Sequence, residues 1–326
     1  MGAGARRVTR ALHDGTRLAR IFHRLALLAA LLLLAFAAPT AAQGDYVGDE
    51  VCAGCHAELV QAYATTVHGR ALRPGNALGE RAARGCEACH GPGREHLRGA
   101  GRGDAAAPDW IPFGGSDVAE VHRENEACRD CHAGSTQRLW PGSPHDAQDV
   151  GCVRCHEVMR PVSPRHLLSR PDQTTLCSEC HPLPRAQQLR NRHMPTRPGV
   201  AGAGGEGFMD CGSCHDPHGT IADALISANT VNESCYACHA EKRGPFLWEH
   251  SPVAESCLNC HEPHGSIRPG MLKLPGSRLC QTCHIESLHP SQNRSAGDRF
   301  VVGQNCGHCH SRIHGSNHPS GSFLTR

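Results

Sequence analysis

Residues 211–215 read Cys-Gly-Ser-Cys-His, and the same Cys-x-x-Cys-His pattern returns at residues 235–239 and 257–261. The pattern occurs ten times in 326 residues and accounts for all 20 cysteines. The cysteine pairs are Cys52/Cys55, Cys86/Cys89, Cys128/Cys131, Cys152/Cys155, Cys177/Cys180, Cys211/Cys214, Cys235/Cys238, Cys257/Cys260, Cys280/Cys283 and Cys306/Cys309. The histidines that directly follow them are His56, His90, His132, His156, His181, His215, His239, His261, His284 and His310. A pattern that leaves no cysteine over indicates one chemistry, repeated ten times.

This spacing is the one at which haem is attached covalently to a polypeptide. Two other uses of cysteine pairs fit less well. A structural zinc ion takes four ligands from two Cys-x-x-Cys knuckles and needs no histidine directly after every pair. Disulfides, which are common in exported proteins, make no such demand either. We therefore predict ten covalent haem c groups, each with the motif histidine as one axial ligand of its iron.

The N-terminus has the pattern of an export signal. Six arginines precede an apolar run over residues 25–38, and Pro39-Thr-Ala-Ala42 follows as a small-residue cleavage site. The run has about 14 residues, fewer than the ~20 that cross a bilayer as a helix. We expect residues 1–42 to be a cleaved signal peptide; an uncleaved anchor is the alternative.

The net charge of the protein restricts the class of macromolecule that it could bind. Removing the leader changes the formal charge from +2 to about −3, because the leader holds six Arg and one Asp. Each haem adds two propionates, and a ferric iron returns one positive charge. The loaded protein is therefore acidic, which argues against a nucleic-acid partner.

Composition predicts a thin polypeptide wrapped around haems. Aromatic residues make up 4% of the chain, and 36 Gly and 22 Pro interrupt helical periodicity. Each motif has about 28 residues of mature chain to itself. We expect a multihaem cytochrome c that is mostly coil, with short α-helices leading into the motifs and almost no sheet.

The first cysteines of successive motifs are 22 to 42 residues apart, which indicates an irregular modular array. A Gly/Ala-rich stretch at residues 198–207 divides this array. We expect a first five-haem module at residues 43–197, a flexible linker at 198–207 and a second five-haem module at 208–326.

The second axial ligand decides whether a haem iron can bind a substrate or only change oxidation state. Apart from the leader and the ten motif histidines there are 13 histidines for ten positions: His68, His96, His122, His145, His166, His193, His218, His250, His264, His289, His308, His314 and His318. His218, His264 and His314 stand three or four residues beyond a motif histidine. Such a close pair cannot easily straddle one haem plane, so we expect each to ligate a neighbouring haem. No vacancy is visible, so we predict an electron carrier without catalytic residues.

Two stretches of the chain resemble the MtrA/DmsE-type decahaem cytochromes. They are residues 235–250, Cys-Tyr-Ala-Cys-His-Ala-Glu-Lys-Arg-Gly-Pro-Phe-Leu-Trp-Glu-His, and residues 306–321, Cys-Gly-His-Cys-His-Ser-Arg-Ile-His-Gly-Ser-Asn-His-Pro-Ser-Gly. Residues 140–145, Trp-Pro-Gly-Ser-Pro-His, match as well. The resemblance covers nearly all of the mature chain and is strongest from Cys211 onward.

The resemblance implies a periplasmic electron wire seated in an outer-membrane β-barrel. Its other partners are periplasmic donor or acceptor cytochromes and, in some complexes, an outer-surface multihaem cytochrome. The need for a wide barrel agrees with general physics, because irregular polar backbone cannot lie in lipid. A soluble periplasmic shuttle that feeds a terminal reductase is the alternative, and a haem enzyme is a third possibility.

The resemblance also implies nine distal iron ligands: His68, His96, His145, His193, His218, His250, His264, His289 and His314. His318 matches a family position of undefined role, whereas His122 and His308 match none and are expected at the surface. After the fourth motif the chain departs from the family, because Met159 stands where a histidine is expected. Spacing favours Met159 as the tenth distal ligand and residue type favours His166, so both stay candidates.

Overall fold

The described part of the chain contains all ten motifs. The computed structural model describes residues 45–73, 75, 78–100, 107–163, 165–193, 209–285, 305–319 and 321–325. The chain divides into two compact units, residues 1–47 with 92–108 and residues 48–91 with 109–326, and the motifs are all in the larger unit. The expected signal peptide and linker lie outside the described residues, and so does His289.

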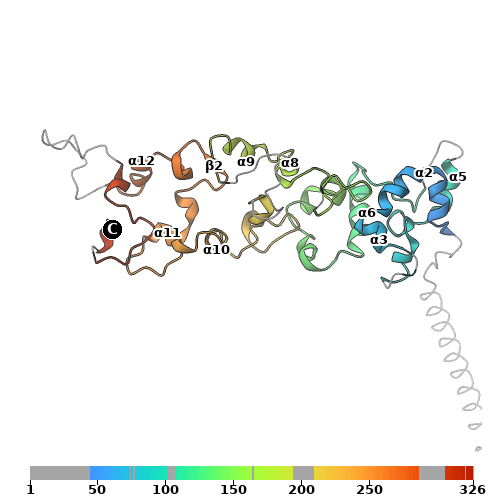
Figure 1. Cartoon of the computed structure of the whole chain (residues 1–326), viewed down its shortest axis with the longest axis horizontal. Coiled ribbons are helices and arrows are strands. Elements are labelled where there is room, and N and C mark those ends of the chain that lie inside the picture. The colour runs from blue at the N-terminus through green and yellow to red at the C-terminus, as the bar shows by residue number, and fades with distance from the viewer. Residues whose placement is uncertain are drawn as a thin grey trace, which may run out of the picture. The chain divides into compact units, whose positions relative to one another are not determined.

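An α-helix leads into each odd-numbered motif. These helices are α2 (Asp49–Ala64), α6 (Val118–Arg129), α8 (Gln173–Cys177), α10 (Val231–Tyr236) and α12 (Gly276–Cys280) (Figure 1). Three begin with a side-chain cap, since Asp117, Asp172 and Thr230 each accept a backbone N–H of the first turn. Helix α2 contains the whole first motif and has a non-helical backbone at His56.

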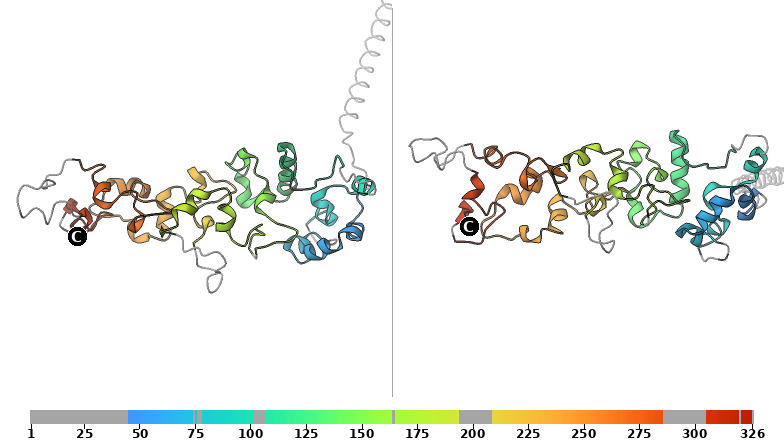
Figure 2. Two further views of the ribbon diagram at one scale, coloured as in Figure 1. Left: turned by 90° about the horizontal axis from the view of Figure 1, so that it is seen from above. Right: turned by 45° about the horizontal axis from the view of Figure 1, so that its top comes forward.

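The even-numbered motifs begin without such a helix. Each lies in one short turn: α4 (Glu87–His90), α7 (Cys152–Cys155), and the 3-10 turns η5 (Cys211–Ser213), η8 (Cys257–Asn259) and η11 (Cys306–His308). Figure 2 shows the elements of the larger unit following one another in chain order. The motifs therefore alternate between two local settings along the chain.

The other elements are equally short. The α-helices are α3 (Val67–Ala71), α5 (Arg94–Ala100), α9 (Pro182–Gln187) and α11 (Ser251–Glu255). The 3-10 turns are η2 (Ala82–Arg84), η3 (Ser135–Leu139), η4 (Asp146–Gln148), η6 (Asp223–Leu225), η7 (Ala240–Lys242), η9 (Pro269–Met271) and η12 (Gly321–Phe323). Within the described residues the sheet has two strands, β1 (Asn191–Arg192) antiparallel to β2 (Gly265–Ser266). This confirms the expected fold class, mostly coil with almost no sheet.

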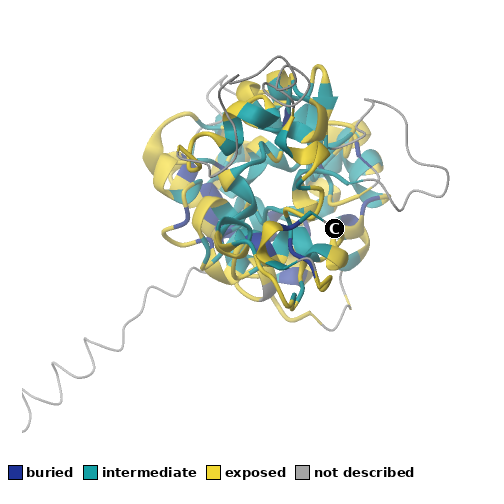
Figure 3. Cartoon of the chain, turned by 90° about the vertical axis from the view of Figure 1, so that its left-hand side faces the viewer, coloured by how far each residue is buried: buried dark blue, intermediate teal, exposed yellow. Residues whose placement is uncertain are grey.

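The described side chains form no ordinary core. Seven apolar residues are buried: Ala82, Ala88, Val121, Ala127, Trp140, Leu168 and Leu324. No large side chain among the described residues is completely buried, and Figure 3 shows half-buried and exposed residues over most of the ribbon. So few buried apolar groups cannot offset the conformational entropy lost on folding. The interior needs another apolar component, as the composition predicted.

Buried asparagines join the third and seventh motifs to the even motifs that follow them. Asn125 of α6 accepts the N–H of Cys152 at 2.8 Å, and Asn232 of α10 accepts the N–H of Cys257 at 2.7 Å. Both asparagines expose less than a tenth of their surface. The side-chain amide of Asn125 also donates to the carbonyl of Val150, and that of Asn232 donates to the carbonyls of Val253 and Ala254. These contacts bring two attachment sites side by side.

Two further contacts have the same role in the larger unit. Asp49 of α2 accepts the N–H of Cys86 at 2.8 Å, and Gln173 of α8 accepts the N–H of Gly212 at 2.7 Å. The Gln173 contact and the β1–β2 pairing both connect residues on the two sides of the 198–207 stretch. The division into two five-haem modules remains a prediction, and these contacts tie its halves together.

We expect Asn232→Ala to lower the free energy of unfolding by about 1–3 kcal/mol, because buried backbone groups lose their partners. Asn232 accepts from Cys257 and donates to the carbonyls of Val253 and Ala254. The measurement is denaturant unfolding of the haem-loaded protein. Asn229→Ala, at an exposed position of the same segment, is the control. Equal unfolding midpoints for the two variants would contradict the assigned role.

Candidate haem-binding site

Each motif closes one helical turn. In nine of the ten, the histidine N–H donates to the carbonyl of the first cysteine at 2.9–3.1 Å. Residues three and four positions apart then lie on one side of the turn. Both cysteine sulfurs and the imidazole can therefore face the same side, which suits two thioethers and one axial ligand on a single haem.

The first cysteines of each odd motif and the following even motif are neighbours. Their thiols lie close enough to shift one another's pKa in five pairs: Cys52/Cys86, Cys128/Cys152, Cys177/Cys211, Cys235/Cys257 and Cys280/Cys306. All twenty thiols are free of disulfides. Before haem attachment, burial raises the pKa of Cys235 to about 12 and that of Cys280 to about 11. Each odd motif thus shares a border with the next motif.

The polypeptide encloses the second cysteines to different degrees. Six of them are exposed: Cys55, Cys131, Cys180, Cys238, Cys283 and Cys309. Five of them belong to the odd motifs, whose histidines are exposed too: His56, His132, His181, His239 and His284. The odd motifs are therefore less enclosed by the polypeptide than most of the even motifs.

The fourth, sixth and eighth motifs are covered by the loops that follow them. After the fourth, sixth and eighth motifs, the chain turns back and donates a backbone N–H to the carbonyl of the second cysteine at 2.8–2.9 Å. The acceptors are Cys155, Cys214 and Cys260, all of them half-buried. At Cys55, Cys180 and Cys283 the chain instead continues away from the motif as a helix, a turn or coil. The difference in exposure thus follows from the path of the chain after each motif.

The even motifs in turn border the next odd motifs. Here the electrostatic neighbours are Cys89/Cys131, Cys155/Cys180, Cys214/Cys235 and Cys260/Cys283. Taken with the pairs of first cysteines, these neighbouring pairs form a series from the first motif to the tenth without a break. The attachment sites form one continuous series.

Seven motif histidines face a second histidine across a constant gap. The pairs are His132/His68, His156/His218, His181/His145, His215/His264, His239/His193, His261/His314 and His284/His250, with ring centroids 5.7–6.2 Å apart. A metal–imidazole bond of about 2.0–2.1 Å on each side of one ion, plus the distance from nitrogen to ring centre, gives roughly 6.3 Å. The gap therefore fits one iron between two imidazoles.

The seven pairs follow two rules. In the upstream series, the partner of a motif histidine comes from earlier in the chain. It lies 11–13 residues after the histidine of the motif two places earlier. This series comprises His132/His68, His181/His145, His239/His193 and His284/His250. In the downstream series, the partner of a motif histidine comes from later in the chain. It lies three or four residues after the histidine of the motif two places later. This series comprises His156/His218, His215/His264 and His261/His314.

The Nδ1 nitrogen of the even-motif histidines also has a hydrogen-bond partner. In all five even motifs, Nδ1–H donates to a carbonyl further along the chain at 2.5–2.8 Å. The acceptors are Ile111, His166, Ala224, Gly270 and Phe323. Because a carbonyl can only accept, the proton is on Nδ1 and the lone pair is on Nε2. This is the arrangement that second contacts impose on metal-binding histidines.

The facing histidines of the upstream series are held by the loops of the downstream series. His145 donates its Nδ1–H to the carbonyl of Pro217 at 2.9 Å, and His250 donates to that of Ile313 at 3.0 Å. His193 makes the same contact with Pro263. Those three acceptors directly precede His218, His314 and His264. Each contact thereby positions two histidines at once: the upstream one that donates, and the downstream one that follows the accepting residue.

Burial keeps several of these imidazoles neutral. It lowers the pKa of His68, His156, His193, His264 and His314, and neighbouring positive imidazoles would lower each pKa further. Neutral imidazole is the form that binds a metal ion. The folded chain therefore presents these side chains ready for iron.

The remaining predicted residues have different surroundings. His90 stacks on Trp110 with ring centroids 5.0 Å apart and meets Phe113 edge-on. His122 is exposed, with its Nε2 3.0 Å from Asp149 Oδ1, as expected of a surface residue. His308 and His318 are also exposed. His96 lies in α5, in the smaller unit.

Met159 and His166 both lie in the loop after the fourth motif. Met159 is half-buried, whereas the His166 side chain is exposed and its carbonyl is bound to His156. Sequence reasoning missed that backbone role of His166. The left-handed φ of 59° at this residue is a tertiary feature without a signal in the sequence.

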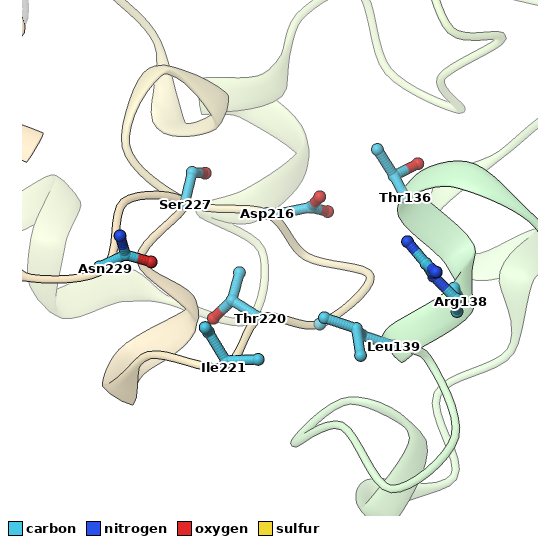
Figure 4. A pocket seen from close by; sticks show the side chains of 9 residues that line it. Thr136, Arg138, Leu139, Asp216, Thr220, Ile221, Ser227 and Asn229 are labelled. Atoms are coloured by element: carbon cyan, nitrogen blue, oxygen red, sulfur yellow. The ribbon is translucent and has the colours of Figure 1, made fainter.

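A hollow of about 300 Å³ lies where the segment after the third motif meets the segment after the sixth. It is lined by Thr136, Arg138, Leu139, Asp216, Gly219, Thr220, Ile221, Ser227 and Asn229. Figure 4 shows Arg138 on one side of it and Asp216 on the other. Asp216 accepts the N–H and the Nδ1–H of His218 at 3.0 and 3.1 Å. The hollow is thus part of the junction that orients His218.

Comparison with known proteins agrees with this geometry. The family model for the doubled CXXCH motif matches residues 203–244 and 250–288, and the model for the NrfB-like cytochrome c-type protein matches residues 85–183. The multiheme cytochrome MtrA of Shewanella baltica (strain OS185) is 37% identical over 298 residues, which cover 87% of this chain and 84% of that protein. This chain belongs to the MtrA family of multihaem cytochromes.

MtrA-type cytochromes are electron carriers, so electron transfer through covalent haem c is the function of this chain. The match extends through most of the motif array, which agrees with the continuous series of attachment sites. Among the described residues, none of the helices is both long enough and apolar enough to cross a membrane.

The relative orientation of the facing rings predicts two spectroscopic classes. Five pairs are close to parallel, at 10–22°, whereas His68/His132 and His145/His181 are steeply inclined, at 66° and 70°. Parallel imidazole planes separate the iron d orbitals more than perpendicular planes do. We expect the electron paramagnetic resonance spectrum of the oxidised protein to contain both rhombic low-spin signals and signals with a large maximal g value. A spectrum of one class alone would contradict these ring angles.

Substituting Asp216 tests the orienting contact. The carboxylate withdraws the Nδ1 proton of His218 and increases electron donation by Nε2, which stabilises ferric iron. We expect Asp216→Asn to raise the reduction potential of one haem and leave the others in place, as measured by spectroelectrochemical titration. Asp223→Asn, an exposed change in the same loop, is the control and should shift no haem. Identical titrations for both variants would exclude the role assigned to Asp216.

Proposed function

We propose that the chain carries ten haems and that the seven facing pairs are the two axial ligands of seven irons. Three features support this: the ring gap fits an iron, the pKa values favour neutral imidazole, and Nδ1 of the even-motif histidines is bound elsewhere. For the other three haems, the proposed proximal ligands are His56, His90 and His310. Their distal ligands come from His96, His289, Met159 and His166, which the sequence singled out.

We propose further that this array is the periplasmic part of an outer-membrane electron conduit. The single observation that carries the proposal is the unbroken adjacency of attachment sites from the first motif to the tenth. A conduit requires every haem to lie next to another, because one missing neighbour stops conduction. The family membership supports the same role. The partners are an outer-membrane β-barrel protein and periplasmic donor or acceptor cytochromes, with an outer-surface multihaem cytochrome as a further partner.

Conduction across a membrane tests the proposal. The chain is co-expressed with its β-barrel partner and inserted into liposomes that contain a reduced viologen dye, and soluble ferric citrate is added outside. We expect rapid dye oxidation, together with an intact mass that exceeds the cleaved polypeptide by ten haems. The double variant Cys235→Ala, Cys238→Ala removes one haem from the middle of the series. It should reduce dye oxidation to the level of liposomes that hold the barrel alone.

Two outcomes would overturn parts of the proposal. A mass showing eight haems or fewer would exclude a fully loaded array. Recovery of the chain in the soluble periplasmic fraction despite an available barrel would favour a shuttle that feeds a terminal reductase. The Cys235/Cys238 variant separates the two, because a shuttle still delivers electrons from haems on one side of the gap.

A further inference from the structure

The downstream series can be extended by one step towards the N-terminus. Its motif histidines each face the residue three or four positions beyond the motif histidine two motifs later. For His90, the corresponding residue lies three positions beyond His156, and it is Met159. We infer that Met159 is the distal iron ligand of the haem held by Cys86, Cys89 and His90. The inference rests on the proposed haem array and assigns one iron in it a histidine–methionine pair.

The loop after the fourth motif is built like the loops after the sixth and eighth. In each, the motif histidine donates Nδ1–H at 2.8 Å to a carbonyl nine or ten residues on. In each, the same histidine also forms an isolated β-bridge two residues beyond that carbonyl. The residues that supply the carbonyl are His166, Ala224 and Gly270, all with a left-handed φ of 54–65°. The three loops therefore have the same backbone arrangement, with one residue more in the fourth loop.

This equivalence decides between Met159 and His166. His166 takes the place of Ala224 and Gly270, which have no side chain able to reach a metal, and its own side chain is exposed. Met159 takes the place of His218. The N–H of each donates at 3.0 Å to the carboxylate two residues earlier, Glu157 Oε1 for Met159 and Asp216 Oδ1 for His218.

The fourth loop lacks the glycine at positive φ that the other three loops have. After the other three downstream histidines the chain continues with glycine: Gly219, Gly265 and Gly315, with φ of 125°, 135° and 126°. A Cβ on Gly219 would lie 2.2 Å from the carbonyl oxygen of Leu139, so the close approach of two segments requires glycine there. Arg160 occupies this place in the fourth loop and does not adopt a positive φ. Its N–H donates to the Glu157 carboxylate instead.

The segment opposite this loop lacks its usual partner as well. His145 and His250 donate Nδ1–H to the carbonyls of Pro217 and Ile313, each of which directly precedes a downstream histidine. The equivalent residue for the fourth loop is His68, and its Nδ1 is buried without a hydrogen-bond partner. The fourth loop is thus held less closely to its neighbour than the other three. A methionine, which is longer and more flexible than histidine, suits a ligand position that is less tightly placed.

Methionine ligation has a consequence for electron flow. A thioether ligand favours ferrous iron more than imidazole does, so it raises the reduction potential of its haem. The second attachment site adjoins the first through Cys52/Cys86 and the third through Cys89/Cys131. An electron that reaches the second haem is therefore retained near one end of the series and can leave only when a neighbour or partner of suitable potential accepts it.

Absorption and potentiometry of the purified, haem-loaded protein test the inference. We expect the oxidised protein to show a weak near-infrared sulfur-to-iron band with the intensity of one haem in ten. Met159→His should abolish the band and move one-tenth of the reductive titration to lower potential. Met159→Leu should abolish it and leave one high-spin haem that binds carbon monoxide when reduced. Met271→Leu, in the equivalent loop after the eighth motif, and His166→Ala should keep the wild-type spectrum.

Deleting one attachment site locates the ligand. The variant Cys86→Ala, Cys89→Ala, with nine haems by mass, should lose the band, whereas Cys128→Ala, Cys131→Ala should retain it. Absence of the band from the wild type, or a high-spin haem in His166→Ala, would overturn the inference. These readouts do not involve the membrane. A conduit with ten bis-histidine haems and a shuttle with one methionine-ligated haem would therefore be told apart.

Discussion

A haem iron takes one ligand on each face of the porphyrin, and a short loop that supplies the first ligand cannot reach round to supply the second. In the proposed arrangement the motif provides one imidazole, and for seven irons the second comes from a segment two motifs earlier or two motifs later. In the proposed arrangement every haem therefore ties together segments that are distant in the sequence. A chain with seven buried apolar side chains among its described residues can be held in this way, since the cofactors replace the missing core.

The polypeptide's own contribution is mostly orientation. Carbonyls fix the Nδ1 proton of the even-motif histidines, and buried asparagines such as Asn125 and Asn232 set the start of the following motif. Both kinds of contact place a reactive group without needing a large packed side chain around it. Backbone hydrogen bonds therefore take over the positioning role that a hydrophobic core has in an ordinary domain.

Repetition also makes an exception visible. Three downstream loops share a histidine, a glycine at positive φ and a carbonyl that binds an upstream histidine, as His145 does with Pro217. The fourth loop has Met159 and Arg160 in the first two places, and His68 lacks the third contact. Three departures at one junction indicate a haem site with its own chemistry, because a single chance substitution would leave the other contacts in place.

The sequence by itself determined the chemistry and the absence of regular layers. Ten repeats of the Cys-x-x-Cys-His motif predicted covalent haem, the scarcity of aromatic residues predicted a thin chain, and the position of His218 three residues after His215 argued against a shared haem. These inferences depend on local spacing, which follows from covalent geometry alone.

The tertiary structure alone decided which histidine faces which and which second cysteines, such as Cys55 and Cys309, lie exposed. It also assigned the carbonyl of His166 to His156, on which our inference in favour of Met159 depends. Those choices depend on segments up to 72 residues apart meeting, as His145 and Pro217 do. No local pattern specifies such a meeting, because it results from every contact along the series.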